Sequence, residues 1–232
     1  AVAVLAATNA VVQTDLPVIR SDRPMQAFAL MAAAFYGAQP AQMVAVTGTD
    51  GKTSTADFYR QFWHLMGRRS ASIGTLGFLG GNGEMLIPGS YTTPYPVALH
   101  EALSALSAQG VSHVCMEASS HGLDQCRLDG VRLTAAAFTN IARDHLDYHG
   151  TEEAYFTAKA RLFSELLPEG GTAVLNQDDV RFAALESICK RRGHRIIGFG
   201  KAGAQFTLLS FTPLATGAKA EVALLGERHA LS

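Results

Sequence analysis

The sequence predicts an α/β protein with a mostly parallel sheet and helices on both of its faces. Short apolar runs alternate along the chain with longer segments in which apolar residues recur at helical spacing. Gly67 and Gly110 follow two of the helical segments and Pro168 ends a third, as is typical of helix C-termini. Polar clusters follow several of the apolar runs, where parallel sheets bind their ligands. We expect strands at Met43–Val46, Ser70–Ile73, His113–Glu117, Ala135–Thr139, Thr172–Asn176 and Arg195–Phe199.

The main helices lie between these strands, and the two ends of the chain follow other patterns. The apolar start AVAVLAATNAVVQ predicts a strand, and RPMQAFALMAAAFYG predicts a short helix before a linker at AQPAQ. Near the other end, AQFTLLSF and AEVALLGE flank a turn and predict a small β hairpin. We expect the main helices at Thr53–Met66, Val97–Gln109, Glu153–Leu167 and Val180–Arg191.

The composition is that of an ordinary globular protein and argues against two kinds of partner. With 232 residues, 48% of them hydrophobic and 17% charged, the chain can bury a substantial core. A net charge of −1 and a pI of about 6.8 argue against nucleic acid as the main partner. No apolar run approaches the ~18 residues of a membrane span, so we expect no membrane insertion. Cys115, Cys126 and Cys189 show no CxxC spacing, which fits a reducing compartment and predicts a cytoplasmic protein.

The stretch TGTDGKTS lies between the first expected strand and a helix and predicts a phosphate-binding loop. Gly48 and Gly51 let backbone N–H groups approach an anion, and the helix N-terminus adds its dipole. Lys52 can reach the terminal phosphates of a nucleotide, and the Thr53 hydroxyl can bind Mg²⁺. The common pattern is GxxxxGK[ST], so this loop is a shorter GxxGK[ST] form. The alternative interpretation is a glycine-rich turn with a surface lysine.

Charged side chains after later strands suggest a second part of the site. Glu117 ends a strand and can hold the magnesium ion of a nucleotide, although a capping acid in a tight turn gives the same pattern. His145 lies among acids in FTNIARDHLDYHG, which suggests a metal or phosphate site. Zinc is disfavoured because no cysteine lies near and the spacing is not HExxH. Lys159 lies on an apolar helix, where a lysine must extend to solvent, pair or be chemically altered.

Five motifs in this order resemble the Mur ligases, which build the peptide of peptidoglycan precursors. They are TGTDGKTS, TTP, MEASSHGLDQCR, FTNIARDHLDYHG and AYFTAKARLF, and the resemblance is strong from Val18 to Asp179. Within the family, the SSHGLDQ and DHLDYHG forms are most similar to the branch that adds the third peptide residue. The resemblance implies that ATP phosphorylates the terminal carboxylate of UDP-MurNAc-L-Ala-D-Glu. The amine of an incoming amino acid would then attack the acyl phosphate.

The resemblance also implies roles for individual residues, with ATP and Mg²⁺ as cofactors. Lys52, His145 and Lys159 would be catalytic, and Lys159 would be carboxylated to a carbamate that binds the second metal ion. Thr53 and Glu117 would hold the first metal ion, and His145 the second. The UDP-MurNAc dipeptide would contact Thr92, Thr93, Ser119, Gln125 and Arg127. ATP would contact Gly48, Thr49, Asp50, Gly51, Lys52, Thr53, Ser54 and, near the adenine, Asn140.

By resemblance, residues 1–40 are the remnant of an N-terminal UDP-binding domain with its linker, and residues 41–232 are the central ATP-binding domain. We expect that domain to be truncated at its C-terminal end, and the C-terminal domain to be absent. The chain is then expected to be a monomer that binds MgATP weakly and is inactive alone. Asp50 and Tyr91 stand where the family usually has asparagine. Two alternatives remain: a folylpolyglutamate synthase-like ligase, and a nucleotide-binding module without chemistry of its own.

Overall fold

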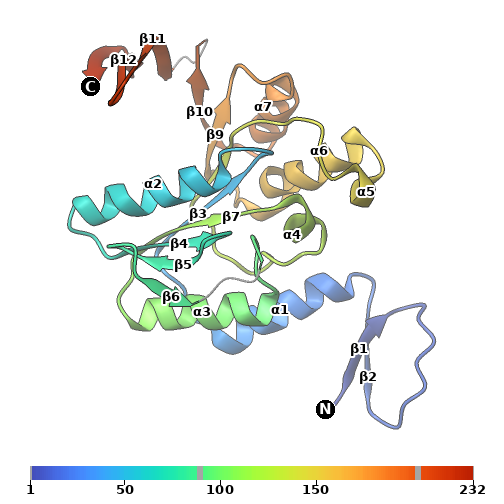
Figure 1. Cartoon of the computed structure of the whole chain (residues 1–232). Coiled ribbons are helices and arrows are strands. Elements are labelled where there is room, and N and C mark those ends of the chain that lie inside the picture. The colour runs from blue at the N-terminus through green and yellow to red at the C-terminus, as the bar shows by residue number, and fades with distance from the viewer. Residues whose placement is uncertain (1, 88–90, 202–204, 232) are drawn as a thin grey trace.

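The computed structural model describes residues 2–87, 91–201 and 205–231 and confirms the predicted α/β class (Figure 1). Its main sheet has 11 strands, and their order is β13-β12-β11-β10-β9-β8-β3-β7-β4-β5-β6. The six expected strands are all present and parallel, and antiparallel strands extend the sheet at both edges. The strand bounds are β3 Gln42–Thr47, β4 Ser70–Gly74, β5 Gly77–Gly80, β6 Met85–Ile87, β7 His113–Glu117, β8 Ala135–Phe138, β9 Thr172–Asn176, β10 Arg195–Gly200, β11 Phe206–Leu214, β12 Gly217–Leu224 and β13 Glu227–Leu231.

Helices cover both faces of this sheet. Their bounds are α1 Pro24–Tyr36, α2 Lys52–Leu65, α3 Pro96–Ala108, α4 Ser120–Asp124, α5 Leu146–His149, α6 Glu152–Arg161, the π-helix η1 Leu162–Leu166, and α7 Phe182–Arg191. Figure 1 shows α2 on one side of the central strands and α1 with α3 on the other. The helix expected at 153–167 changes at Arg161 from α-helix to π-helix. The helix expected at 180–191 begins later, because the Asp179 carboxylate accepts the Arg181 N–H at 2.8 Å in a turn.

The N- and C-terminal segments lie at opposite ends of the molecule (Figure 1). β1 (Val4–Ala7) confirms the strand expected near the N-terminus, and it pairs in parallel with β2 (Val18–Ser21), which the sequence pattern does not predict. At the other end, β11 and β12 form the expected hairpin, and β13 adds a third antiparallel strand. All residues of β13 are exposed, so it lacks the alternation of buried and exposed positions that would have predicted it.

The core lies between the sheet and its helices and holds the strand ends in register. Met43 of β3, Met116 of β7 and Phe138 of β8 are fully buried, and Leu99 and Leu103 of α3 belong to the same cluster. Close packing of this kind leaves neighbouring strands little freedom to shift. The three cysteines are buried and free. In the described part of the chain, no helix has the length and apolar character needed to cross a bilayer.

Candidate functional site

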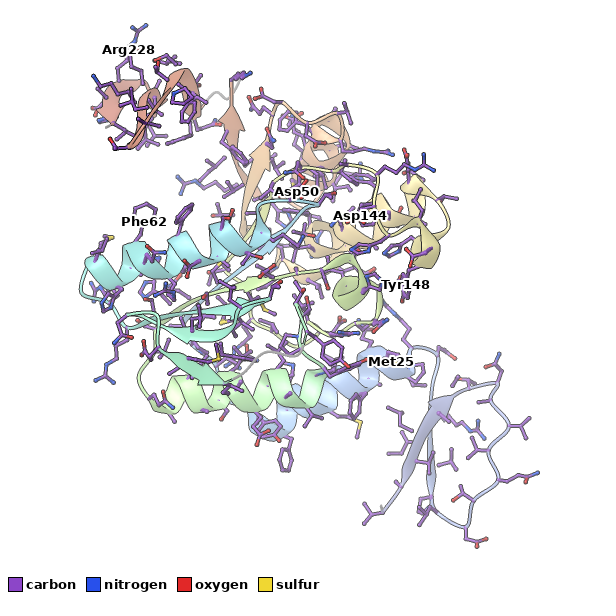
Figure 2. The ribbon with its side chains drawn as sticks, in the orientation of Figure 1. Met25, Asp50, Phe62, Asp144, Tyr148 and Arg228 are labelled. Carbon is purple, nitrogen blue, oxygen red and sulfur yellow. The ribbon has the colours of Figure 1, made fainter. Side chains whose placement is uncertain are left out.

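Polar segments from three parallel strands meet at the carboxyl edge of the sheet. β3 lies between β7 and β8, with Val46 in register with Glu117 on one side and Ala137 on the other. The loop after β3 therefore lies between the acid that ends β7 and the polar segment that follows β8. Figure 2 shows Asp50 of this loop and Asp144 of the segment after β8 near each other in the same part of the molecule. This edge carries most of the residues that the sequence predicts for the site.

The loop has the backbone geometry that its two glycines permit. Gly48 has a φ of +152°, and a Cβ there would overlap the Thr139 hydroxyl. Gly51 lies in the left-handed region, with a φ of 83°, immediately before α2. The Thr139 hydroxyl donates to the Asp50 carbonyl at 2.6 Å, and the Asn140 side chain accepts from the Asp50 N–H at 3.0 Å. The end of β8 thus holds the loop at the N-terminus of α2, where helices bind phosphate.

Asn140 therefore lies on the loop backbone in this structure, and a contact with adenine stays a prediction. Thr49 is held on the same side, because its hydroxyl accepts the Ala142 N–H at 2.9 Å and lies 3.2 Å from the Tyr155 hydroxyl. Ser54 is exposed in the first turn of α2. All the residues predicted to contact ATP phosphates thus come from one loop and one helix start.

Two lysines from different helices meet on one carbonyl of the loop. The Lys52 amine donates to the carbonyls of Gly48 at 3.0 Å and Thr49 at 2.8 Å. The Lys159 amine donates to the same Gly48 carbonyl at 2.6 Å, and only 1% of this residue is exposed. Burial lowers the pKa of Lys52. Burial, and next the charge of Lys52, lower the pKa of Lys159 to about 7, so a large share of this amine is neutral near physiological pH.

Glu117 and Thr53 line one small pocket beside the loop. The Glu117 carboxylate is buried and accepts the Thr75 N–H at 2.8 Å and the Thr75 hydroxyl at 3.4 Å. A Cβ at Gly74 would overlap this carboxylate, so glycine makes room for it. A carboxylate has about four lone-pair positions, so oxygen lone pairs remain for another partner. The pocket therefore offers two hard oxygen donors, the kind that Mg²⁺ prefers.

His145 lies in an aromatic and histidine cluster at the start of α5. Its backbone has a left-handed φ of 50°, and its Nε2 lies 3.5 Å from a carboxylate oxygen of Asp144. Its ring centre lies 4.8 Å from that of His121 and 6.1 Å from that of Tyr155. Within the described ranges, no three His, Cys, Asp or Glu side chains are grouped to hold a metal ion. A metal ion on His145 would therefore need oxygen ligands from groups other than a cluster of these four residue types.

The residues predicted to bind the muramyl dipeptide form one hydrogen-bonded group. The Thr93 hydroxyl donates to the Glu117 carbonyl at 2.8 Å and lies 3.0 Å from the Ser119 hydroxyl. The Arg127 guanidinium donates to the Thr93 carbonyl at 2.9 Å and to the Gln125 side-chain oxygen at 3.0 and 2.6 Å. This group shares Glu117 with the pocket beside the loop, so the two predicted halves of the site are contiguous.

Thr92 and several aromatic residues border the same group. The Thr92 hydroxyl lies 3.0 Å from that of Thr75, which also contacts Glu117. Arg127 lies over the Tyr95 ring at 4.1 Å and near the Tyr91 ring at 5.4 Å. Tyr95 was not predicted as a site residue, and its only signal in the sequence is that a second tyrosine follows soon after the threonine pair in YTTPY. Tyr91 thus takes part in a cation–π arrangement where the family usually has asparagine.

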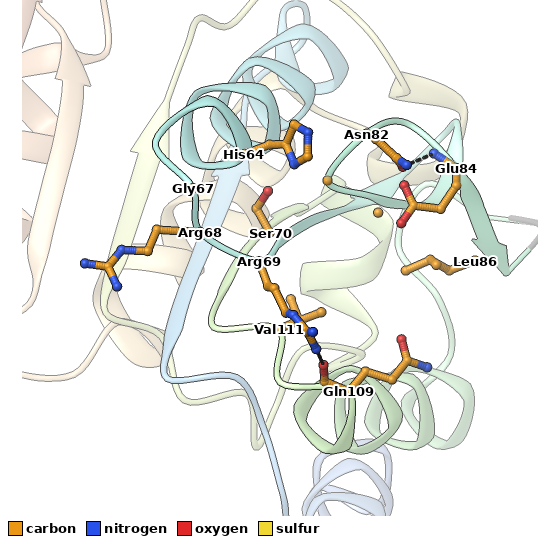
Figure 3. Close-up of a pocket in the computed structure, with 12 residues that line it drawn as sticks. His64, Gly67, Arg68, Arg69, Ser70, Asn82, Glu84, Leu86, Gln109 and Val111 are labelled. Carbon is orange, nitrogen blue, oxygen red and sulfur yellow. Dashed lines mark hydrogen bonds between the residues drawn. The ribbon is translucent and has the colours of Figure 1, made fainter.

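A large cavity lies at the opposite edge of the sheet, where the parallel strands begin (Figure 3). It has a volume of about 620 Å³, and its lining includes Ser70, the first residue of β4, and Gln109, which follows the last residue of α3. Figure 3 shows Arg69 donating to the Gln109 carbonyl, at 2.5 Å, while Arg68 points away from the other lining residues. Ligands of parallel sheets bind at the carboxyl ends of the strands. We therefore assign the candidate site to the loop edge and not to this cavity.

The sequence of this chain matches a protein-family model and is similar to those of several bacterial ligases. The model for the Mur ligase middle domain matches residues 46–229. The UDP-N-acetylmuramoyl-L-alanyl-D-glutamate--2,6-diaminopimelate ligase of Caulobacter vibrioides is 45% identical over 235 residues, which cover all of this chain and 48% of that protein. The ligase of the same name from Brucella melitensis is 52% identical, over 77% of this chain and 36% of that protein. The chain thus spans half or less of the length of these relatives.

Solved structures agree with this similarity. A structure of a UDP-N-acetylmuramoyl-L-alanyl-D-glutamate--2,6-diaminopimelate ligase gives a TM-score of 0.80 at 28% identity, over 93% of this chain and 44% of its own. The MurF ligase of Thermotoga maritima in complex with ADP gives 0.64 at 19% identity, over 100% and 49%. A complex of FPGS with AMPPCP and folate gives 0.68 at 16% identity, over 89% and 56%. The last two matches show a shared fold.

Proposed function

Because the chain belongs to the Mur ligase family through its middle domain, we propose that it is the ATP-binding core of an amide ligase. The proposed acceptor is UDP-MurNAc-L-Ala-D-Glu, and the proposed amino acid is the 2,6-diaminopimelate in the names of the relatives. ATP phosphorylates the D-Glu carboxylate, and the amine nitrogen attacks the resulting acyl phosphate. The products are an amide, ADP and phosphate. Positioning and charge neutralisation do most of the catalysis in phosphoryl transfer, so the site must above all hold its reactants in line.

The observation that carries this proposal is the meeting of two lysines on the phosphate loop. The amines of Lys52 and Lys159 both lie within 3.0 Å of the Gly48 carbonyl oxygen. The Lys52 cation beside a helix N-terminus attracts a polyphosphate, and Lys159 holds the loop carbonyl in place. In the proposed complex, Lys52 leaves the loop carbonyls and contacts the β and γ phosphates of ATP. Gly48 keeps its hydrogen bond from Lys159 while this happens.

The oxygen donors beside the loop fit a magnesium ion bound together with the nucleotide. Mg²⁺ is usually held by one or two carboxylates together with phosphate oxygens and water. The Glu117 carboxylate and the Thr53 hydroxyl supply such donors from a common pocket. When bound, Mg²⁺ neutralises charge that develops on the transferred phosphoryl group. We propose His145 as a ligand of a second ion, with Lys159 supplying the oxygen ligands that this histidine lacks.

Lys159 can supply oxygen ligands only after modification. A carbamate forms when a neutral amine attacks the carbon of CO₂: the N–C bond forms, one C=O π bond opens to leave a negatively charged oxygen, and the nitrogen releases a proton to solvent. The depressed pKa of Lys159, about 7, favours the neutral amine that this reaction requires. The product carries a negative charge and two oxygen atoms in place of the amine. The change would turn the two-lysine site into one lysine and one metal-binding carboxylate.

The Thr93, Ser119 and Arg127 group is proposed to hold the dipeptide end of the acceptor. Arginine binds a carboxylate through two parallel hydrogen bonds, which also fixes the orientation of the carboxylate. In this structure the Arg127 fork is occupied by the Gln125 side chain, which a substrate carboxylate would displace. The Thr93 hydroxyl also donates to the Glu117 carbonyl, so a dipeptide held by this group would lie next to the acid beside the phosphate loop.

The test is phosphate release by the longest natural chain that contains these 232 residues. We expect release only when UDP-MurNAc-L-Ala-D-Glu and 2,6-diaminopimelate are both present. Lys159→Ala is expected to reduce turnover at least ~100-fold, in the range attributed to misplaced catalytic groups, with an unchanged circular dichroism spectrum. Lys219→Ala, which changes an exposed lysine on β12, is the matched control. Release that depends on a folate and glutamate instead would favour the folylpolyglutamate synthase alternative, and nucleotide binding without any release would favour a non-catalytic module.

The 232-residue chain by itself is proposed to bind MgATP weakly and to show no ligase turnover. Its relatives carry about as much sequence again, since the match covers 48% of the Caulobacter protein. Catalysis by orientation needs both reactants held, and effective molarities of ~10⁵ M or more are lost when one is free in solution. We expect a standard binding free energy for MgATP of about −4 to −5 kcal/mol. Substrate-dependent phosphate release by this chain at ~1 s⁻¹ or faster would contradict the proposal.

A further inference from the structure

A buried ion pair links the helix that carries Lys159 to the segment that carries the predicted substrate residues. Arg161 ends α6, two residues after Lys159. Side chains two positions apart on an α-helix leave it on nearly opposite sides. Lys159 reaches the phosphate loop, whereas Arg161 reaches Asp129 and the carbonyl of Leu123 at the end of α4. One short piece of helix therefore contacts both proposed halves of the site.

The contacts of Arg161 use almost its whole donor set. Its two terminal nitrogens donate to the two Asp129 carboxylate oxygens at 2.6 and 2.9 Å. The Arg161 Nη1 also donates to the Leu123 carbonyl at 2.8 Å, and the Arg161 Nε donates to the Glu165 carboxylate at 3.0 Å. Only 2% of Asp129 is exposed. A planar guanidinium with a bidentate partner allows little rotation, so α6 is fixed relative to the turn after α4 through Asp129 and to α4 itself through Leu123.

The partners of Arg161 belong to elements that serve the site. Leu123 lies in α4 between Ser119 and Gln125, two of the residues predicted to bind the muramyl dipeptide. Glu165 lies in the π-helix η1, which continues α6, and π-helical turns occur frequently at functional sites. The start of α1 reaches the same two carboxylates, since Gln26 donates to Asp129 at 2.8 Å and Arg23 donates to Glu165 at 3.0 Å. The ion pair therefore lies at a junction of α1, α4, α6 and η1.

We propose that Arg161, paired with Asp129, is a positioning residue that sets the separation between Lys159 and the substrate segment 119–127. This inference rests on the proposed function, because it assigns the two sides of the pair to the two reactants. Arg161 touches neither reactant and acts through α6 and α4. Stability alone is a poor explanation, since apolar residues of similar volume often replace buried ion pairs without loss of stability. A bidentate ion pair fixes the orientation of α6 relative to the turn that follows α4, which apolar packing alone does not do.

The test uses the charge-neutral double variant Asp129→Asn/Arg161→Gln in the longest natural chain. This variant leaves no unpaired buried charge and keeps amide groups that can hydrogen-bond to each other. We expect kcat to fall by ~10–100-fold, the size of effect that a displacement of about 1 Å produces, with KM for ATP within about twofold. Amide hydrogen exchange in residues 119–127 is expected to become faster under native conditions. Arg161→Lys keeps the charge without the fork and is expected to fall between the double variant and the wild type.

The matched control is Glu153→Gln, also on α6, which breaks the ion pair between the exposed Glu153 and Arg181, the residue before α7. It is expected to change neither kcat nor exchange in residues 119–127. Unchanged kcat and unchanged exchange in the double variant would overturn the inference. A smaller folded fraction with normal kcat per folded molecule would also overturn it, because the pair would then serve stability alone. If the wild type shows no ligase turnover, the proposed function fails, and the exchange measurement still decides whether the pair orders the segment.

Discussion

Replacing Lys159 by methionine is expected to stabilise the folded protein at low pH and to do so less at high pH. The Lys159 amine is buried, and its pKa falls from 10.5 to about 7 on folding. At about 1.36 kcal/mol per pKa unit, this shift of about 3.5 units corresponds to a penalty on the order of 5 kcal/mol for burying the cation. The variant is free of this penalty and is stabilised accordingly. It also loses the hydrogen bond from Lys159 to the Gly48 carbonyl, which offsets part of the gain, although Lys52 still donates to that carbonyl. We expect a net gain of about 2–4 kcal/mol at pH 6.

The sign of the pH dependence follows from proton binding. The pKa is lower in the folded state, so between about pH 7 and 10.5 the unfolded chain binds more protons and the wild type gains stability as pH rises. The advantage of Lys159→Met should therefore shrink by about 2–3 kcal/mol between about pH 6 and pH 9. Urea denaturation in CO₂-free buffer measures this, with the exposed Lys219→Met as control. A variant less stable than the wild type at low pH, or a difference that does not change with pH, would refute the reasoning.

Three other changes test the loop and the substrate group. Asp50→Asn removes an acid next to the phosphates and should raise MgATP affinity by about 0.3–1 kcal/mol at low salt and less at high salt, as measured by calorimetry. Gly48→Ala should abolish measurable MgATP binding and lower the free energy of unfolding by about 1–3 kcal/mol, because the alanine Cβ would overlap the Thr139 hydroxyl at a positive φ. Adding Thr139→Ala should recover part of that stability. No recovery in the double variant would argue against the overlap as the cause. Arg127→Lys should raise KM for UDP-MurNAc-L-Ala-D-Glu about tenfold with KM for ATP unchanged, since lysine lacks the bidentate fork. Equal effects on the two KM values would argue against Arg127 as the group that binds the acceptor carboxylate.

The features that the sequence predicts correctly are those set by residues close to one another along the chain. The six central strands and the loop with Lys52 follow from local patterns, because a buried strand, two glycines and a helix start lie within about a dozen residues. The order of the polar clusters after successive strands also places Glu117 and the segment after β8 at one edge, since parallel strands share their carboxyl ends. The strand β13 and the change to a π-helix at Leu162 have no such local signal.

The remaining parts of the site depend on contacts between distant residues. Nothing near Arg161 in the sequence identifies Asp129 as its partner, or Tyr95 as the ring beneath Arg127. Likewise, the sequence places Lys159 on an apolar helix without showing that its amine meets the carbonyl of Gly48. Such pairs are set by how helices pack on the sheet, which single-sequence patterns do not determine. The depressed pKa of Lys159 is a consequence of that packing.

MgATP binding to the 232-residue chain and to Lys52→Ala, titrated side by side, tests the central claim most directly. Among the described residues, the Lys52 amine donates hydrogen bonds only to loop carbonyls, so its replacement leaves the core untouched. We predict sub-millimolar to millimolar affinity for the wild type and a loss of about 1.5–3 kcal/mol in the variant, the scale of a hydrogen bond to a charged group. Equal affinity of the two proteins for MgATP would contradict the assignment of this loop as the nucleotide site.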